Sequence, residues 1–224
     1  MKISRDNHSF IEIGGKKMAH IQVLVHSSIK IEGKKVVYID PFQLTESPHD
    51  ADYIFFTHPH DDHFSLEDIE KVSQKTTKYI LPESIEKEKS SLLPNDQQIK
   101  VKPNEKYEVE DFTFETTYAY NLNKQFHPKE NAWVGYVLTI EGIRYYIAGD
   151  TDSIPEIQTV SCDIAFLPVG GTYTMDYQEA AKLANQLPAQ VVIPTHYGSI
   201  VGTKEEGKKF ATLIQKKEVK VFIE

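Results

Sequence analysis

The sequence predicts an α+β fold in which two β-sheets pack face to face and helices cover their outer surfaces. Short runs rich in β-branched and aromatic residues recur along the whole chain, with Gly and Pro between them. Only a few segments have the three- and four-residue apolar spacing of a helix. No linker-like stretch divides the 224 residues, so we expect one domain, 1–224, with a substantial core.

Short strands dominate the first third of the chain, and we expect them to form a sheet of hairpins. Over the whole chain we expect mostly antiparallel strands. A helix should follow at 65–72, because Ser65 is a suitable N-cap, acidic residues occupy the first turn, and apolar residues recur at three-residue spacing. The expected strands of this third are 10–13, 20–25, 29–31, 36–39 and 53–56.

The remainder of the chain alternates strands with three further helical segments. A short helix is expected at 82–90, and longer ones at 177–187 and about 204–216. The last of these carries Phe210, Leu213 and Ile214 on one face, as an amphipathic helix on a sheet does. The expected strands are 79–81, a run near 101, 107–109, 112–117, 134–140, 144–148, 164–168, 191–194 and 219–223.

A cluster of metal-ligand residues directly follows the apolar run 53–56. Residues 57–63 read Thr-His-Pro-His-Asp-Asp-His, with three imidazoles and two carboxylates in seven positions. Imidazole nitrogen and carboxylate oxygen are ligands for zinc, iron and manganese. His58 and His60, as alternate residues at a frayed strand end, can face one ion, while Asp62 and His63 turn toward a second. The cluster therefore predicts a metal site.

Two ions about 3.5–4 Å apart need more donors than this cluster supplies. Two other strand ends offer them. Asp150 follows the strand 144–148 after a small residue, where a carboxylate can bridge two cations. His196 follows the strand 191–194 in the same way and is a further ligand candidate. Taken singly, each residue is as well explained as a turn residue or as a hydrogen-bonded histidine at a sheet edge.

The order of these three motifs resembles the metallo-β-lactamase superfamily, over most of the chain. The resemblance implies a four-layer αββα sandwich with the metal centre along one edge, between the sheets. It also implies a division of the ligands: His58 and His60 bind the first metal, Asp62, His63 and His196 bind the second, and Asp150 bridges the two.

Within the superfamily, the chain is similar to predicted metal-dependent hydrolases related to the ascorbate-phosphate lactonases and to phospholipase D-like enzymes that act on N-acyl phosphatidylethanolamine. The residues that carry this similarity lie at 25–29, 39–42, 148–151 and 167–171. It implies that His26 and Asp40 lie on loops near the metals, as contacts of the substrate or of the ligands. A purely structural, hydrogen-bonding role is the alternative for both residues.

The chain departs from the superfamily at the third histidine of the first metal. Asn121 stands at the expected strand end, and an amide oxygen is a poorer zinc ligand that suits a harder ion. His127, six residues later in a polar loop, is the alternative ligand; a His127 that contacts the substrate or is simply exposed to solvent is the slightly favoured interpretation. Lys124 and Lys129 flank His127 and either hold a phosphate or carboxylate over the metals or are simply solvated.

These residues predict a metal-dependent hydrolase that uses a metal-bound hydroxide on a small phosphoester, or on a lactone or other ester. Asp62 would orient the attacking water, and His26, His127 and Tyr197 are candidates to stabilise the oxyanion or to assist the leaving group. One or two zinc ions are the expected cofactor, with manganese or iron as alternatives. A non-catalytic, metal-stabilised binding or sensing protein with a degenerate first site is the alternative function, and two-iron redox chemistry is a weaker one.

Composition and charge indicate which class of ligand the protein binds and in which compartment it works, and we expect a small-molecule substrate. A net charge of -8 and a pI near 5.6 argue against a nucleic acid. Cys162 is the single cysteine and lies in an apolar run, which predicts a buried thiol and a reducing compartment. No run approaches the roughly 18 apolar residues of a membrane span, and the start lacks an apolar signal core. We therefore expect a cytoplasmic protein, and a homo-oligomer is compatible with the sequence.

Overall fold

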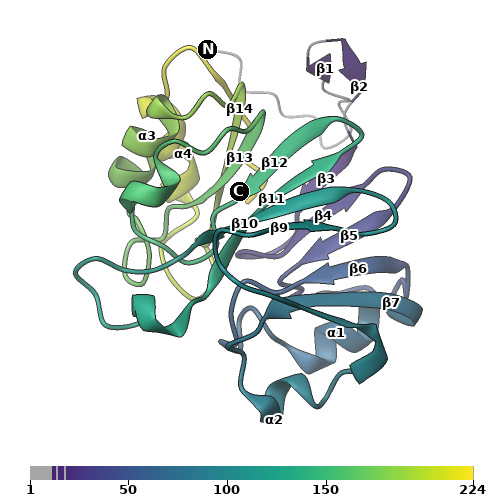
Figure 1. Cartoon of the computed structure of the whole chain (residues 1–224). Coiled ribbons are helices and arrows are strands. Elements are labelled where there is room, and N and C mark those ends of the chain that lie inside the picture. Colours follow the sequence, from purple (N-terminus) through teal and green to yellow (C-terminus); the bar gives the residue numbers. More distant parts are fainter. Residues whose placement is uncertain (1–11, 14, 18, 224) are drawn as a thin grey trace.

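Two large β-sheets form the centre of the protein, which is described by a computed structural model over residues 12–13, 15–17 and 19–223 (Figure 1). A separate hairpin of β1 (Glu12–Ile13) and β2 (Lys16–Lys17) precedes them. The first sheet contains, in spatial order, β3 (His20–Val23), β4 (Ile29–Glu32), β5 (Val36–Ile39), β6 (Ala51–Phe55), β7 (Ser73–Pro82) and β8 (Gln98–Val101). The second contains β15 (Glu218–Val219), β14 (Val191–Thr195), β13 (Ile164–Pro168), β12 (Ile143–Ile147), β11 (Val134–Ile140), β10 (Thr113–Tyr118) and β9 (Lys106–Glu108).

Helices cover the outer face of each sheet, so the predicted four-layer αββα sandwich is confirmed (Figure 1). The first sheet is covered by α1 (Leu66–Val72) and α2 (Lys87–Ser90), and the second by α3 (Tyr177–Gln186) and α4 (Glu205–Leu213). Single 3₁₀ turns lie in the connections, at η1 (Asn95–Gln97), η2 (Lys129–Asn131) and η3 (Pro155–Ile157). Among the described residues, no helix is both long and apolar enough to cross a membrane.

The largest apolar cluster fills the space between the two sheets. Phe55 of the first sheet packs edge-on against Phe114 and Tyr136 of the second, with ring centroids 5.2 and 5.0 Å apart. A second cluster joins α3 and α4 to the outer face of the second sheet, and a third joins α1 to the outer face of the first. Cys162 is buried in the second cluster, as predicted, and burial raises the pKa of its thiol to about 12.

Several predicted boundaries shift in the structure. Ser65 is the N-cap of α1, and its side chain accepts a hydrogen bond from the Asp68 backbone amide, as predicted. The helices expected at 82–90 and 204–216 shorten to α2 and α4, and the strand expected at 219–223 shortens to β15. The strand expected at 10–13 begins outside the described residues, at Phe10 and Ile11.

The prediction of mostly antiparallel strands was wrong. In the first sheet the neighbouring strands β5, β6, β7 and β8 all run parallel to one another. In the second sheet β12, β13, β14 and β15 do the same. Parallel neighbours need a long crossover, and segments such as 56–72, which contains α1, supply it. As a result β3, β5 and β6 run in one direction in the first sheet, and β10, β12 and β14 in one direction in the second. Their carboxyl ends meet at one edge of the sandwich, which is where polar loops can converge.

Candidate metal centre

The predicted ligands converge at this edge, each from the loop that follows a strand. His26 follows β3, the His-rich segment follows β6, His127 lies in the loop after β10, Asp150 follows β12 and His196 follows β14. Among the described residues, three sets of side chains bring donor atoms within 4.8 Å of one another. The sets are His58, His60 and His127; His26, Asp62, His63 and His196; and His58, His63 and Asp150.

Three imidazoles form what we call the first position: His58, His60 and His127. His58 Nε2 lies 3.1 Å from His60 Nδ1, and the His127 ring packs 5.1 Å from both other rings. His58 and His127 are buried, whereas His60 is half-buried. The structure thus brings His127, and not Asn121, to the place of the missing third histidine.

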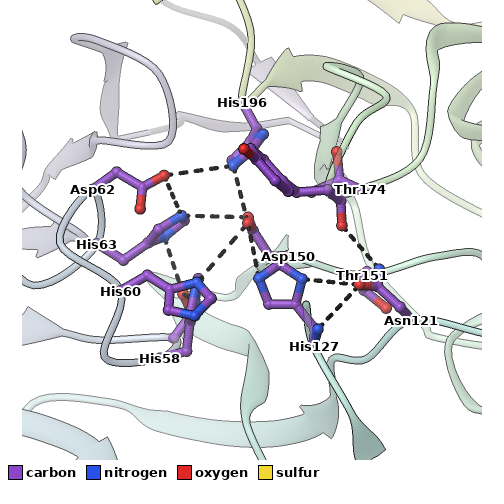
Figure 2. A network of polar contacts seen from close by, with 12 residues as sticks. His58, His60, Asp62, His63, Asn121, His127, Asp150, Thr151, Thr174 and His196 are labelled. Atoms are coloured by element: carbon purple, nitrogen blue, oxygen red, sulfur yellow. Dashed lines mark hydrogen bonds and ion pairs between the residues drawn. The ribbon is translucent and has the colours of Figure 1, made fainter. Parts of the chain in front are cut away.

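One carboxylate and two imidazoles form what we call the second position: Asp62, His63 and His196. Asp62 Oδ2 lies 3.5 Å from His63 Nε2 and 3.8 Å from His196 Nε2 (Figure 2). His26 Nε2 approaches the same carboxylate oxygen to 3.3 Å. Both histidines of the position are fully buried and Asp62 is half-buried, so each position combines two buried histidines with one half-buried ligand.

Asp150 lies between the two positions, as Figure 2 shows. Its Oδ2 lies 2.9 Å from His196 Nε2 and 3.3 Å from His127 Nε2, and its Oδ1 lies 3.4 Å from His63 Nε2. The preceding Gly149 has φ +67, and a Cβ there would meet the Val134 carbonyl at 3.1 Å. Glycine therefore allows the sharp turn that carries the carboxylate from β12 into the centre.

A buried carboxylate behind the second position orients His63. Asp40 Oδ2 lies 2.7 Å from His63 Nδ1, and Asp40 also accepts hydrogen bonds from the backbone amide and hydroxyl of Thr57. With Nδ1–H donated to Asp40, the Nε2 atom of His63 is the one presented to Asp62 and Asp150. Of the two roles predicted for Asp40, the structure assigns it contact with a candidate ligand.

The electrostatics of the cluster suit cation binding. Burial holds the pKa of His58 well below its usual value, and burial likewise lowers the pKa of His60 and His26. Burial opposes ionisation of Asp150, yet His196 and His63 hold its pKa well below the usual range. Burial opposes protonation of His63, yet Asp150 and Asp40 hold its pKa well above its usual value, so this imidazole releases a proton when a cation binds. Neutral His58, His60 and His26 and the ionised Asp150 already have the protonation states that bind metals.

Several buried donor atoms lack a hydrogen-bond partner within the described part of the chain. They are His63 Nε2, His127 Nε2, Asp150 Oδ1 and both ring nitrogens of His26 and His196. Unsatisfied buried polar atoms are costly, and here the Nε2 atoms of the four histidines face the carboxylates of the centre, Asp62 and Asp150. The side chains therefore fit divalent cations, which would supply the partner that the protein itself does not.

Asn121 lies behind His127 and not among the donors, which corrects its predicted role as a ligand. Its Oδ1 accepts hydrogen bonds from the backbone amide and, at 3.1 Å, from Nδ1 of His127, while its Nδ2 donates to the Tyr173 carbonyl (Figure 2). The amide oxygen is thus engaged by two donors. Through the ring contact it turns Nε2 of His127 toward Asp150.

Tyr197 is also placed differently from its predicted catalytic role. Its side chain is fully buried in the cluster beneath α4, and its hydroxyl donates to the Ile223 carbonyl at 3.0 Å. A Cβ on Gly207 of α4 would lie 2.3 Å from that hydroxyl, so the ring fills the space under this helix. Adjacency to His196 in sequence is misleading here, because successive side chains at a strand end point in opposite directions.

The two lysines expected to hold an anion are paired with carboxylates. Lys124 donates to Asp152, and Lys129 donates to Glu156 at 2.7 Å while lying over the rings of Tyr118 and Tyr120. Each pairing neutralises the charge that a phosphate would need.

Trp133, for which the sequence allows either packing in the sheet or a place at the cleft mouth after the loop 124–131, lies at the site. Its ring lies 5.0, 4.9 and 5.5 Å from those of His58, His60 and His127 and forms a wall of the first position. A cleft of about 610 Å³ opens beside it, lined by His60, Phe126 and Asp61 among others. The sequence signal for this role is the position of Trp133 directly after the polar loop that carries His127.

Comparisons with known proteins agree with this geometry. Residues 20–196 match the model of the β-lactamase superfamily domain. A metal-dependent hydrolase of Ligilactobacillus salivarius is 31% identical, over 94% of this chain and 91% of its own, and one of Lysinibacillus sphaericus is 29% identical, over 88% and 92%. A crystal structure of a protein from Parabacteroides distasonis has 27% identity and a TM-score of 0.75, over 91% of this chain and 93% of that one.

Proposed function

Because the chain belongs to the β-lactamase superfamily, we propose that it is a metal-dependent hydrolase that acts on a small, uncharged ester or lactone. The observation that carries the proposal is the convergence of two sets of donor atoms on Asp150 beside an open cleft. Zinc is the proposed cofactor, since imidazole and carboxylate ligands suit it, and iron and manganese are alternatives.

The first position would be held by His58, His60 and His127, the second by Asp62, His63 and His196, and Asp150 would contact both. When bound, the cations supply Lewis acidity, which lowers the pKa of a bound water and polarises the bond to be broken. The protein provides the rest of the chemistry. His60 borders the cleft, so the substrate carbonyl enters from that side, and Phe126, which is 49% exposed, offers an apolar surface for its remainder.

Asp62 is the side chain best placed to orient the attacking water. It is 18% exposed on its side chain, unlike the other carboxylate of the centre, Asp150, at 3%. Burial opposes its ionisation, but contacts from His26 and His63 hold its pKa far below the usual range. A carboxylate with so low a pKa accepts a hydrogen bond from water without taking the proton. Its contribution is therefore orientation.

The charge of the cleft favours an ester or lactone over a phosphoester. Asp61, Glu86 and Glu88 line it, and its lysine, Lys89, donates to Asp61 at 2.7 Å. Lys124 and Lys129 are paired elsewhere, as described above. A phosphate group in the cleft would be repelled by these carboxylates, and none of the three lysines is unpaired and able to offset the repulsion.

The test is hydrolysis by protein stripped of metal and then loaded with Zn²⁺ or Mn²⁺. We expect metal-dependent turnover of p-nitrophenyl acetate and of a simple lactone, and at least about tenfold less turnover of p-nitrophenyl phosphate. His63→Ala should lose the ester activity with its fold intact, and the exposed His49→Ala should keep it. A protein that binds two ions and hydrolyses none of these compounds would instead support the non-catalytic binding function.

A further inference from the structure

His26 is fully buried at the metal centre, and neither of its ring nitrogens makes a well-formed hydrogen bond to the described residues. Nε2 instead faces Asp62 Oδ2 at 3.3 Å, and the ring centroid lies 3.9 Å from that of His196. If this ring only filled space, a phenylalanine or leucine would do so without the cost of burying an imidazole. The Nε2 atom, aimed at a carboxylate of the second position, points instead to a ligand role.

The backbone around His26 holds the ring in this place at a cost. His26 has φ +56, a left-handed conformation that residues other than glycine rarely adopt. The loop is closed by reciprocal bonds, from the Leu24 amide to the Ser28 carbonyl and from the Ser28 amide to the Val25 carbonyl. The His26 carbonyl also accepts a 2.9 Å hydrogen bond from the His196 amide. The β3–β4 loop is therefore fastened to the end of β14, where the second position lies.

We infer that His26 is itself a ligand of the second cation, so that this position has four ligands of its own besides the shared Asp150: His26, Asp62, His63 and His196. The inference rests on the metal centre of the proposed function and adds a division of roles. The first position has only three ligands of its own besides Asp150, and it lies beside the cleft. A position with fewer protein ligands has a coordination site to spare, so the first position is the one with room for the substrate.

His26→Asn is the decisive variant, because asparagine tolerates the left-handed backbone but its amide is a poor zinc ligand. The chain offers a matched control in His49→Asn, since His49 also has a positive φ of 47 and is exposed, away from the centre. Zinc content and affinity are measured by elemental analysis and by competition with a chromogenic chelator. The visible absorption of the Co²⁺-loaded proteins and the melting temperatures with and without zinc complete the comparison.

We expect wild type and His49→Asn to hold two zinc ions, and His26→Asn to hold one tightly. The affinity of the second ion should fall more than about 100-fold, because loss of a residue that merely orients a ligand costs about 10- to 100-fold. The melting temperature without zinc should change little, while the rise on adding zinc should shrink. The d–d absorption of the Co²⁺ form should also change.

Two tightly bound ions and an unchanged Co²⁺ spectrum in His26→Asn would overturn the inference and leave the proposed function standing. A fall of less than about 100-fold in the affinity of the second ion, with a lower melting temperature before zinc is added, would also overturn the inference. His26 would then be a residue that positions Asp62 and not a ligand. Wild type that binds no zinc, Mn²⁺ or iron would overturn the proposed function as well. If His26→Asn does not fold, His26→Asp decides: a carboxylate ligand should restore the second ion with a shifted Co²⁺ spectrum, and an unshifted one would contradict the inference.

Discussion

The first position lines the cleft through the half-buried His60, whereas no side chain of the second lines it and one of its three ligands is a carboxylate, Asp62. Their supports differ as well. The ring of His127 is oriented by the neutral amide of Asn121, and that of His63 by the buried carboxylate of Asp40. A carboxylate behind a histidine makes the ligand more basic than an amide does. One centre can therefore combine a strongly held ion with a more exchangeable one.

The largest effect should come from breaking both positions at once, with Asp150→Asn. Asp150 contacts histidines of both, so we expect both ions to be lost under dialysis and ester hydrolysis to fall at least about 10³-fold, or about 4 kcal/mol of transition-state stabilisation. Elemental analysis and initial rates measure this. Asp96→Asn is the control, because its side chain is exposed and lies outside the cleft lining. An Asp150→Asn protein with two ions would contradict the bridging role.

Removing a ligand of the first position alone should release one ion and leave the other bound. His127→Ala should leave one tightly bound ion and reduce hydrolysis strongly, because the remaining ion lies in the second position. Asn121→Ala should keep both ions but weaken the first about 10- to 100-fold, since only the orienting hydrogen bond is lost. Chelator competition measures both variants. Equal losses in the two would show that Asn121 is itself a ligand.

A backbone change should disturb the second position specifically. A Cβ on Gly170 would lie 2.1 Å from the His196 carbonyl oxygen, so Gly170→Ala must displace the end of β14. We expect a loss of about 1–3 kcal/mol in the free energy of unfolding, together with weaker binding of one ion. Urea unfolding with and without zinc measures this. Gly33→Ala is the control, because the Cβ there meets the flexible end of Glu141.

We expect the smallest effect from Asp68, which anchors the loop that contains Gln43 and Leu44. Burial opposes its ionisation, but hydrogen bonds from Ser65, from the Leu44 and Gln43 amides and from Lys71 lower its pKa. A lowered pKa stabilises the fold above the unfolded value of about 3.9, and this is lost as pH falls through the folded pKa.

Asp68→Asn should therefore cost less than about 3 kcal/mol at pH 7, and the difference from wild type should shrink below pH 4. Urea unfolding of the metal-free proteins at several pH values measures it, and both proteins share the same histidine cluster, so its titration cancels. A difference that grows as pH falls would contradict the assigned direction. The metal affinities should remain equal, which would separate loop anchoring from the second position.

Sequence patterns predicted much of this fold. Strands 36–39, 134–140 and 164–168 have the predicted bounds, and Ser65 caps α1, because local preferences and apolar periodicity set such elements. Strand direction was mispredicted, because direction depends on whether a connection crosses over the sheet, and no short pattern records that.

The candidate ligands divide in the same way. His58, His60, Asp62 and His63 were accessible to sequence reasoning because one segment carries all four at a strand end. Asp150 and His196 were found by the same strand-end rule, and the structure brings both to the centre. Their ligation of metal stays a prediction until metal content is measured.

Residue types and their order along the chain set the chemistry available to this protein: imidazoles and carboxylates after strands, a single thiol in an apolar run, and apolar surfaces for two sheets. The packing of the sheets and their loops then selects which of these atoms meet. It brought His127 in and placed Asn121 behind it, turned Tyr197 away, and distinguished the buried His26 from the exposed His49. The physical reason is that ligand geometry depends on loops fastened across two sheets, by bonds between residues far apart in the chain.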